Sequence, residues 1–333
     1  MPKLSRAERE EIARRRIVSV LRTQGVVNSR TLEQKIADAG PSHLRIQPHI
    51  LTGVRAQMEK EGRVVTIGGT DARWLHLDDE SGARVAARHA ELSAVWADFS
   101  GKPVRMRTGQ ALEIAVFRSL VASQGIKTFG GFVDLSNPSG TGLYSKNEIH
   151  TLNGRSLGKE ALDFIVQAGG EECGVEVKNV REWLYPNRSE IRDAVRKALH
   201  LGTIPVIIAR RIPYVTFRLM ATCGVLLHQN YNQLMAHTDA AVAARAAHRE
   251  LLGYHDIRVG DQPDARLATF IGKNLPALAP QARARLNAFG DLLERFALGD
   301  DMSYAEFAAR VRRRENGEKE ESDWPDDPND IEY

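Results

Sequence analysis

One stretch of this sequence limits the possible folds more than any other: the run IPVIIARRI, which begins at Ile204 and is rich in β-branched residues. A continuous apolar run of this kind is typical of a strand that is buried on both faces of a sheet. Helical patterns precede and follow it in RSEIRDAVRKALHLG and TFRLMATCG, and a second strand pattern, VLLHQN, comes next. Because strands and helices alternate here, the sequence predicts an α/β core with a mixed sheet.

The N-terminal region, residues 7–77, has a different pattern. Helices are predicted in REEIARRRIVSVLRTQG, NSRTLEQKIADAG and QPHILTGVRAQMEKEG, and each ends at a glycine: Gly25, Gly40 and Gly62. Two short β runs around GGTD then predict a hairpin. Helices followed by a hairpin in this order resemble a winged helix-turn-helix domain, which implies either DNA binding or a protein–protein contact.

The composition is that of a globular protein with two or more domains. The chain has 333 residues, of which 42% are hydrophobic and 27% are charged, so it can bury a substantial core. Its cysteines, Cys173 and Cys223, lie in apolar segments without CxxC spacing. They predict reduced core thiols in a cytoplasmic protein rather than a structural zinc site.

The sequence favours a cytoplasmic location and gives no sign of a membrane partner. No apolar run approaches the length of a membrane span, and the N-terminus lacks the apolar segment of a secretory signal. The formal net charge of +3 permits a nucleic-acid partner without requiring one.

A charged pair ends the strand pattern in LDFIVQAGGEECGVEVKNVREW. Alternation along a strand places Glu176 and Lys178 on one face and Val175 and Val177 on the other. By itself such a pair is ordinarily a solvated edge pair. Asp163, however, heads the preceding strand pattern, and AGGEE between them supplies a turn. A hairpin would therefore bring the two carboxylates together.

These residues resemble the motif of the PD-(D/E)XK nucleases. In that superfamily a carboxylate on one strand faces E-x-K on its hairpin neighbour, as Asp163 would face Glu176 and Lys178, and a further acidic residue often lies on the preceding helix, where this chain has Glu113. The resemblance covers roughly residues 104–236, and Leu162 stands where the strict motif has proline. It implies a restriction-endonuclease-like mixed-sheet core with helices on both faces.

Phosphodiester hydrolysis explains why these residue types belong together. A hard cation polarises the phosphoryl oxygen and activates water, and Mg²⁺ prefers carboxylate, carbonyl and water oxygens. We therefore expect Mg²⁺, with Mn²⁺ as a possible substitute, to be bound by Asp163, Glu176, Glu113 and the carbonyl of Val177. Lys178 would hold the attacking water or stabilise charge that develops on the phosphate.

Further polar residues are candidates for contact with nucleic acid. In the winged domain they are the exposed positions of the third helix and one position in the wing: Gln47, His49, Thr52, Arg55 and Arg73. Beyond the motif they are Asn179, Arg181, Arg192 and Arg196, with Arg210 and Arg211 at the end of the buried strand. The alternative for the helical arginines is a solvated helix face, and the alternative for Trp183 and Tyr185 is packing rather than base stacking.

The sequence predicts five segments: a winged helix-turn-helix domain at 1–78, a helical connector at 79–103, a nuclease core at 104–255, a C-terminal helical appendage at 256–314 and an acidic, disordered tail at 315–333. The tail is either an inert solubilising segment or a nucleic-acid mimic that docks through Trp324 and Tyr333.

The expected function is that of a Mg²⁺-dependent DNA endonuclease acting on duplex DNA, in restriction or antiviral defence. A double-strand cut would need a homodimer or a partner protein. The alternatives are a non-catalytic DNA-binding or scaffold protein on a nuclease-like fold, a repair or transposon-end-cleaving nuclease, and a nuclease that acts on RNA.

Overall fold

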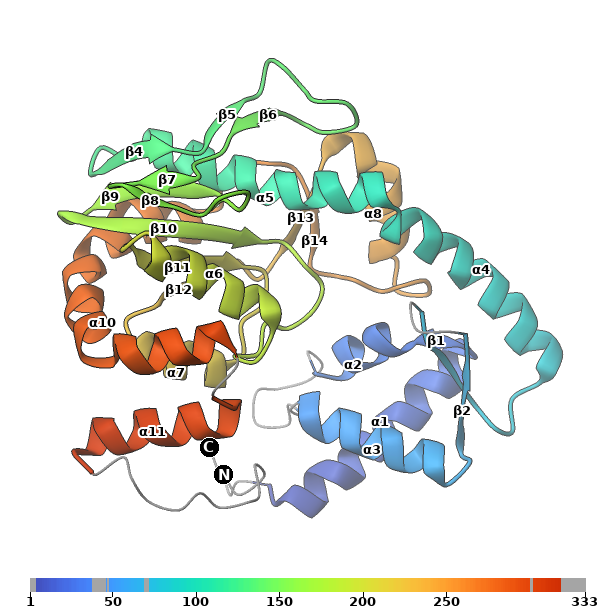
Figure 1. The fold of residues 1–333 in the computed structure, drawn as a ribbon. Helices are drawn as coiled ribbons and strands as arrows, with labels where there is room; N and C mark the ends of the chain where they lie inside the picture. Colours follow the sequence, from blue (N-terminus) through green and yellow to red (C-terminus); the bar gives the residue numbers. More distant parts are fainter. Residues whose placement is uncertain (1–3, 38–45, 47, 69–71, 300–301, 319–333) are drawn as a thin grey trace. The chain divides into compact units, whose positions relative to one another are not determined.

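The computed structural model describes residues 4–37, 46, 48–68, 72–299 and 302–318 (Figure 1). The predictions for Gln47, Trp324 and Tyr333 lie outside the described residues. The chain divides into two compact units. Unit 1 comprises Met1–Val104 and Thr238–Ile257, and unit 2 comprises Arg105–His237 and Arg258–Tyr333.

Unit 1 begins with helices and a small sheet. Its elements are α1 (Arg6–Gln24), β1 (Val27–Asn28), α2 (Ser29–Ala37), α3 (Pro48–Lys60), β2 (Val64–Ile67) and β3 (Trp74–Leu77). The strands form an antiparallel sheet in the order β1-β3-β2. A capping box between Ser5 and Glu8 starts α1, and Gly25, at φ 74°, ends it. β1 was not predicted from the sequence, because a run of two residues is too short to show alternation.

The remainder of unit 1 is α4 (Gly82–Ser100) and the later helix α8 (Ala240–Ala247). α8 packs on α4, and the segment after α8 is bonded to α2: Thr31 donates to Tyr254 Oη, and Gln34 donates to Asp256 Oδ1. These contacts place residues 238–257 in unit 1, so the expected boundary of the core at residue 255 is wrong. Before α8 the chain forms β13 (Gln233–Met235).

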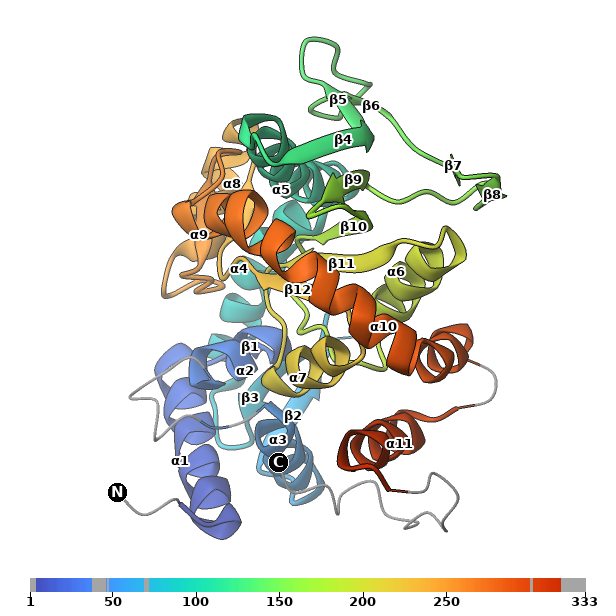
Figure 2. The ribbon, with the colours of Figure 1, turned by 90° about the vertical axis from the view of Figure 1, so that its left-hand side faces the viewer.

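Unit 2 is built on an open mixed sheet, which confirms the predicted α/β class (Figure 2). The strand order is β12-β11-β10-β9-β4, and the bounds are β4 (Ile126–Gly130), β9 (Phe164–Ala168), β10 (Glu171–Lys178), β11 (Ile204–Ala209) and β12 (Leu226–Gln229). β10, β11 and β12 are parallel, whereas β9 is antiparallel to both β10 and β4. All six residues of β11 are buried, as its β-branched composition predicts.

Helices cover both faces of this sheet. α5 (Lys102–Ala122) packs on Phe164, Val175 and Val206 on one face. On the other face, α6 (Ser189–His200) and α7 (Tyr214–Thr222) pack with Ile207 and Leu227. α10 (Leu275–Leu298) contributes side chains to both layers.

α10 lies against the turns that lead into β10 and into the edge strand β12. A Cβ at Gly169 would meet the Pro276 carbonyl oxygen at 2.1 Å, and one at Gly224 would meet the Ala282 carbonyl oxygen at 2.4 Å. Both glycines also have positive φ, which glycine adopts at little cost. Glycine is therefore required at both positions where α10 crosses this end of the sheet. The candidate site lies at the opposite end.

The smaller elements of unit 2 include two short hairpins. They pair β5 (Phe132–Asp134) with β6 (Ser145–Asn147) and β7 (Thr151–Leu152) with β8 (Arg155–Ser156). The other elements that the structure describes are η2 (His237–Asp239), β14 (Ile257–Val259), α9 (Ala265–Thr269), η3 (Phe270–Asn274) and α11 (Tyr304–Asn316). Within the described ranges, no helix combines the length and apolar character needed to cross a membrane.

Candidate active site

Asp163 closes the open end of the β9–β10 hairpin. The last paired residues are Phe164 and Val175, so one step further along the register Asp163 comes beside Glu176. There the Val177 peptide N–H donates to Asp163 Oδ2 at 2.8 Å. A side-chain carboxylate thus binds the backbone within the E-x-K segment and fixes Asp163 beside it.

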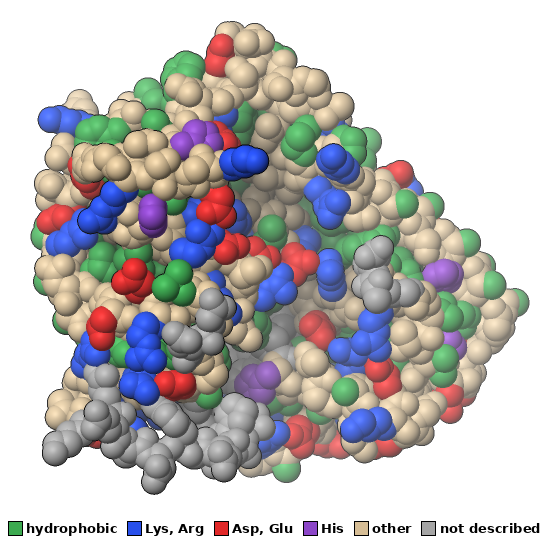
Figure 3. All heavy atoms as spheres, viewed as in Figure 1, with side chains coloured by type: hydrophobic (Ala, Val, Ile, Leu, Met, Phe, Trp, Pro, Cys, Tyr) green, Lys and Arg blue, Asp and Glu red, His purple; other side chains and the backbone are tan. Residues whose placement is uncertain are grey.

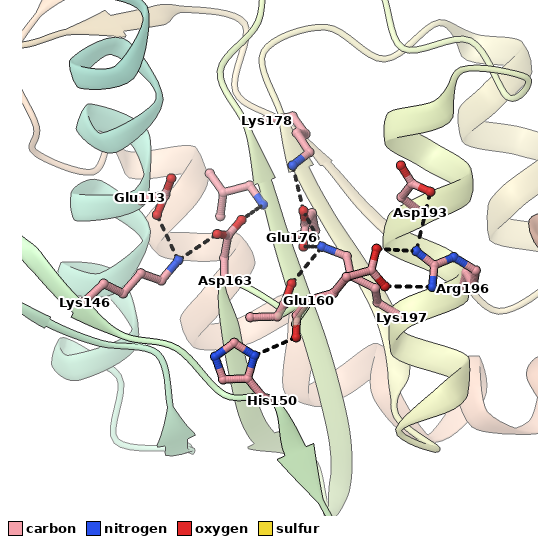
Figure 4. Close-up of polar contacts among 12 residues, drawn as sticks. Glu113, Lys146, His150, Glu160, Asp163, Glu176, Lys178, Asp193, Arg196 and Lys197 are labelled. Carbon is pink, nitrogen blue, oxygen red and sulfur yellow. Dashed lines mark hydrogen bonds and ion pairs between the residues drawn. The ribbon is translucent and has the colours of Figure 1, made fainter. Parts of the chain in front are cut away.

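The second oxygen of Asp163 belongs to a lysine bridge. Lys146, on β6, donates to Asp163 Oδ1 at 2.7 Å and to Glu113 Oε2, on α5, at 3.0 Å. The Tyr144 hydroxyl donates to the same Glu113 oxygen. Figure 4 shows Glu113 and Lys146 on the α5 side of Asp163. The lysine ammonium is therefore shared between two of the predicted metal ligands.

Glu176 has lysine partners of its own. Lys178 donates to Glu176 Oε1 at 2.6 Å, and Lys197, on α6, contacts both Glu176 oxygens at 2.8 and 2.9 Å. Lys197 also donates to the Ala161 carbonyl at 2.8 Å. The side chain of Glu176 is only 7% exposed and that of Lys197 11%. This is a buried ion pair with the additional hydrogen bonds that such pairs require.

The charges of the two lysine–carboxylate groups act on one another, so the two groups form one site. Burial raises the pKa of Glu113, and Asp163 raises it further, against the opposing effect of Lys146. Burial would lower the pKa of Lys146, but Asp163 and Glu113 raise it to about 12. Burial likewise opposes the charge of Lys178, yet Glu176, then Asp163 and Glu113, raise its pKa above its ordinary value. All three carboxylates therefore act on Lys178.

Glu113 and Asp163 form the part of the site whose oxygen donors suit a hard cation. Glu113 and Asp163 already share a positive charge, the ammonium of Lys146, while burial and the nearby Asp163 raise the pKa of Glu113. Mg²⁺ is usually held by one or two carboxylates together with water and substrate oxygens. The described residues contain no group of three or more His, Cys, Asp or Glu side chains gathered as for a metal ion, and Glu176 is bound to its lysines.

Several residues expected to touch nucleic acid have other partners. Asn179 is buried and donates to the carbonyls of Thr108 and Leu234, so it braces the core. Arg192 donates to the Phe296 carbonyl on α10, and Arg196 forms a two-bond contact with Glu160. The expected helix face is therefore committed to neighbouring segments of unit 2.

Arg181 and His150 are also held within unit 2. Arg181 Nη1 donates to Gln233 Oε1 at 3.1 Å. His150 Nδ1 lies 2.7 Å from the Glu160 carbonyl oxygen, a contact drawn in Figure 4. On the face drawn in Figure 3, Lys and Arg side chains are interspersed with Asp and Glu side chains.

In unit 1, the two candidate arginines are paired with acidic residues. Arg55 is buried and lies 2.6 Å from Glu59, and Arg73 lies 2.9 Å from the same carboxylate. Thr52 donates to Glu33 at 3.1 Å, but both Thr52 and His49 are exposed. His49 and Thr52 are therefore the more accessible of the candidate contacts on α3.

Two residues of the site, Tyr144 and Lys146, were not predicted from the sequence, and neither was the contact of Lys197 with Glu176. Lys146 and Tyr144 lie in a Gly/Ser/Asn-rich segment without strand alternation, so no pattern marks them. Lys197 follows Arg196 on a helix, and its spacing alone does not show which of the two points inward.

Comparison with known proteins gives no match: no protein-family model, curated protein or solved structure is similar to the chain. The function is therefore inferred from the residues of the site.

Proposed function

We propose that this protein is a metal-dependent endonuclease that hydrolyses phosphodiester bonds in DNA, with a restriction-endonuclease-like core in unit 2. The observation that carries the proposal is the contact of Asp163 with the Val177 peptide, which fixes a carboxylate beside Glu176 and Lys178 at the end of a buried hairpin. Glu113 on α5 reaches the same place through Lys146.

The residues of the site have distinct roles in this proposal. Glu113, Asp163 and the Val177 carbonyl would hold Mg²⁺ or Mn²⁺, which when bound supplies Lewis-acid polarisation of the phosphate and a more acidic water. Lys178 keeps its proton because three carboxylates act on it, so it can donate to a phosphate oxygen or orient the attacking water. Lys197 holds Glu176 in place. Glu176 would join the metal ligands only by parting from Lys178 and Lys197.

Unit 1 would position the chain on duplex DNA as a winged helix. The order α1-β1-α2-α3-β2-β3 and the exposed His49 and Thr52 on α3 support this role. Replacing both residues with alanine should weaken binding of the full chain to duplex DNA, measured by fluorescence anisotropy in EDTA. Unchanged binding would exclude α3 as a contact.

The proposed activity is tested by incubating the full-length protein with supercoiled plasmid in Mg²⁺, in Mn²⁺ and in EDTA. Nicked or linear product that depends on the metal supports the proposal. A defence role predicts that unmethylated and methylated plasmids are cut at different rates, whereas a repair or transposon-end nuclease would select a DNA structure or a specific end.

A second candidate is a non-catalytic DNA-binding or scaffold protein. It is favoured by the lysine partners of each carboxylate, because Lys146 and Lys197 supply the positive charge that a metal ion would otherwise bring. DNA binding without any metal-dependent cutting of DNA or RNA would support this candidate.

A further inference from the structure

A row of alternating aromatic and arginine side chains lies beside the candidate active site. The Arg211 guanidinium carbon lies 5.9 Å from the centre of the Trp183 ring and 5.6 Å from that of Tyr231. Arg266 lies over the same Tyr231 ring at 4.8 Å. We call Trp183, Arg211, Tyr231 and Arg266 the arginine–aromatic row. Neither Tyr231 nor Arg266 was singled out by the sequence.

Backbone hydrogen bonds connect this row to Lys178. The Arg210 N–H donates to the Lys178 carbonyl at 3.1 Å, and the Tyr231 N–H donates to the Arg210 carbonyl at 3.0 Å. These bonds continue the lateral order of β10, β11 and β12 past their carboxyl ends. The row therefore begins next to the proposed catalytic lysine, at the edge of a parallel sheet where ligands commonly bind.

Tyr231 has an unfavourable backbone for its residue type. Its φ is 64°, in the left-handed region that non-glycine residues rarely adopt, and the residue is 43% exposed. A bulky residue kept in this conformation with a partly exposed ring is more readily explained by a ligand contact than by packing, since such strain concentrates at binding sites.

Arg266 carries positive charge into the same place. It is exposed, and within the described part of the chain no carboxylate forms an ion pair with it. Guanidinium groups bind phosphate and stack on bases, and aromatic rings stack on any base, so together they suit a single strand of nucleic acid. A base pair within a duplex would not expose its faces to such a row.

We infer that the arginine–aromatic row binds an unpaired segment of the DNA strand that flanks the cleavage position, with phosphate on Arg266 and an unstacked base against the row at Tyr231. The inference rests on the proposed nucleic-acid function. It adds a preference for DNA with a single-stranded segment next to the duplex, such as an overhang, a flap or a locally opened end.

The test compares two fluorescent probes, a blunt duplex and the same duplex with a ten-nucleotide overhang, by anisotropy with the full-length protein in EDTA, so that no cutting occurs. Tyr231→Asn removes the ring and keeps a residue that tolerates the left-handed backbone. It should raise the Kd for the overhang probe roughly five- to tenfold, with little change for the blunt duplex. Tyr231→Phe keeps the ring and should bind both probes like the wild type.

Arg266→Gln should weaken binding to the overhang probe and lower the slope of log K against log salt by about one. Arg312→Gln, the same change at an exposed arginine on α11, is the matched control and should alter neither. Thermal denaturation of each variant shows whether it is folded. If Tyr231→Asn does not fold, the comparison of Arg266→Gln with Arg312→Gln tests the inference.

Three results would overturn the inference: equal losses on the two probes, no loss for either variant, or no binding of either probe by the wild type. The nuclease proposal fails separately. If Tyr231→Asn selectively loses the overhang probe while no metal-dependent cutting is found, the row binds single strands and the catalytic assignment is wrong.

Discussion

The Lys146 ammonium lies 2.7 Å from Asp163 and 3.0 Å from Glu113, so one lysine is shared between a carboxylate of α5 and the carboxylate that precedes β9. All three side chains are largely buried, and the lysine is 7% exposed. Removing the ammonium would leave two buried negative charges without their common partner, a state that only protons or another cation can relieve.

Lys146→Met should therefore destabilise the protein by about 3–5 kcal/mol in urea unfolding without divalent ions. Millimolar Mg²⁺ should restore part of this loss, because a divalent ion can replace the ammonium between the carboxylates. Lys127→Met, on the exposed face of β4, is the control and should change stability by less than about 0.5 kcal/mol. A Lys146→Met protein that Mg²⁺ stabilises no more than the control would contradict the cation site.

Gly131 lies between β4 and β5, the first strand of the hairpin that carries Lys146, and its backbone packs against the start of β9. A Cβ there would lie 2.2 Å from the Asp163 carbonyl oxygen, and φ is 81°. Gly131→Ala should thus cost the strain of the left-handed backbone, roughly 1 kcal/mol, plus displacement of Asp163. Gly140→Ala has the same backbone problem, at φ 57°, but no atom within 4 Å. Chemical denaturation should show a clearly larger loss for Gly131→Ala, and equal losses would refute the contact.

His228 should make the protein sensitive to mild acid. It stacks on Phe270, and burial lowers its pKa from 6.5 to about 4. The folded-state pKa is depressed, so the folded protein favours the neutral form of His228. This contribution to the free energy of unfolding is complete above pH 6.5 and is lost as pH falls toward 4. Between pH 7 and pH 5 the loss is about 2 kcal/mol. His228→Leu should remove this part of the pH dependence of unfolding, whereas His237→Gln, at an exposed site, should retain it.

The β9–β10 hairpin could be predicted from the sequence, because the apolar alternation and the AGGEE turn fix its register and hence the place of Asp163 beside Glu176. The lysine partners of Asp163 and Glu176 could not be predicted from the sequence. Lys146 lies in a segment without periodicity, and the inward direction of Lys197 depends on packing between α6 and the sheet. Asn179 illustrates the reverse error: it follows the motif directly, yet its amide is used inside the core.

The most direct test of the central claim is the single-turnover rate of plasmid cleavage in Mg²⁺ for the wild type, Asp163→Asn and Lys178→Ala, with Glu148→Gln as a control at an exposed carboxylate near the site. If these residues form the active site, the wild type cuts, both site variants lose about 100-fold or more in rate, and Glu148→Gln is unaffected. Cutting that survives Asp163→Asn and Lys178→Ala at the wild-type rate, or a wild type that never cuts, would contradict the account.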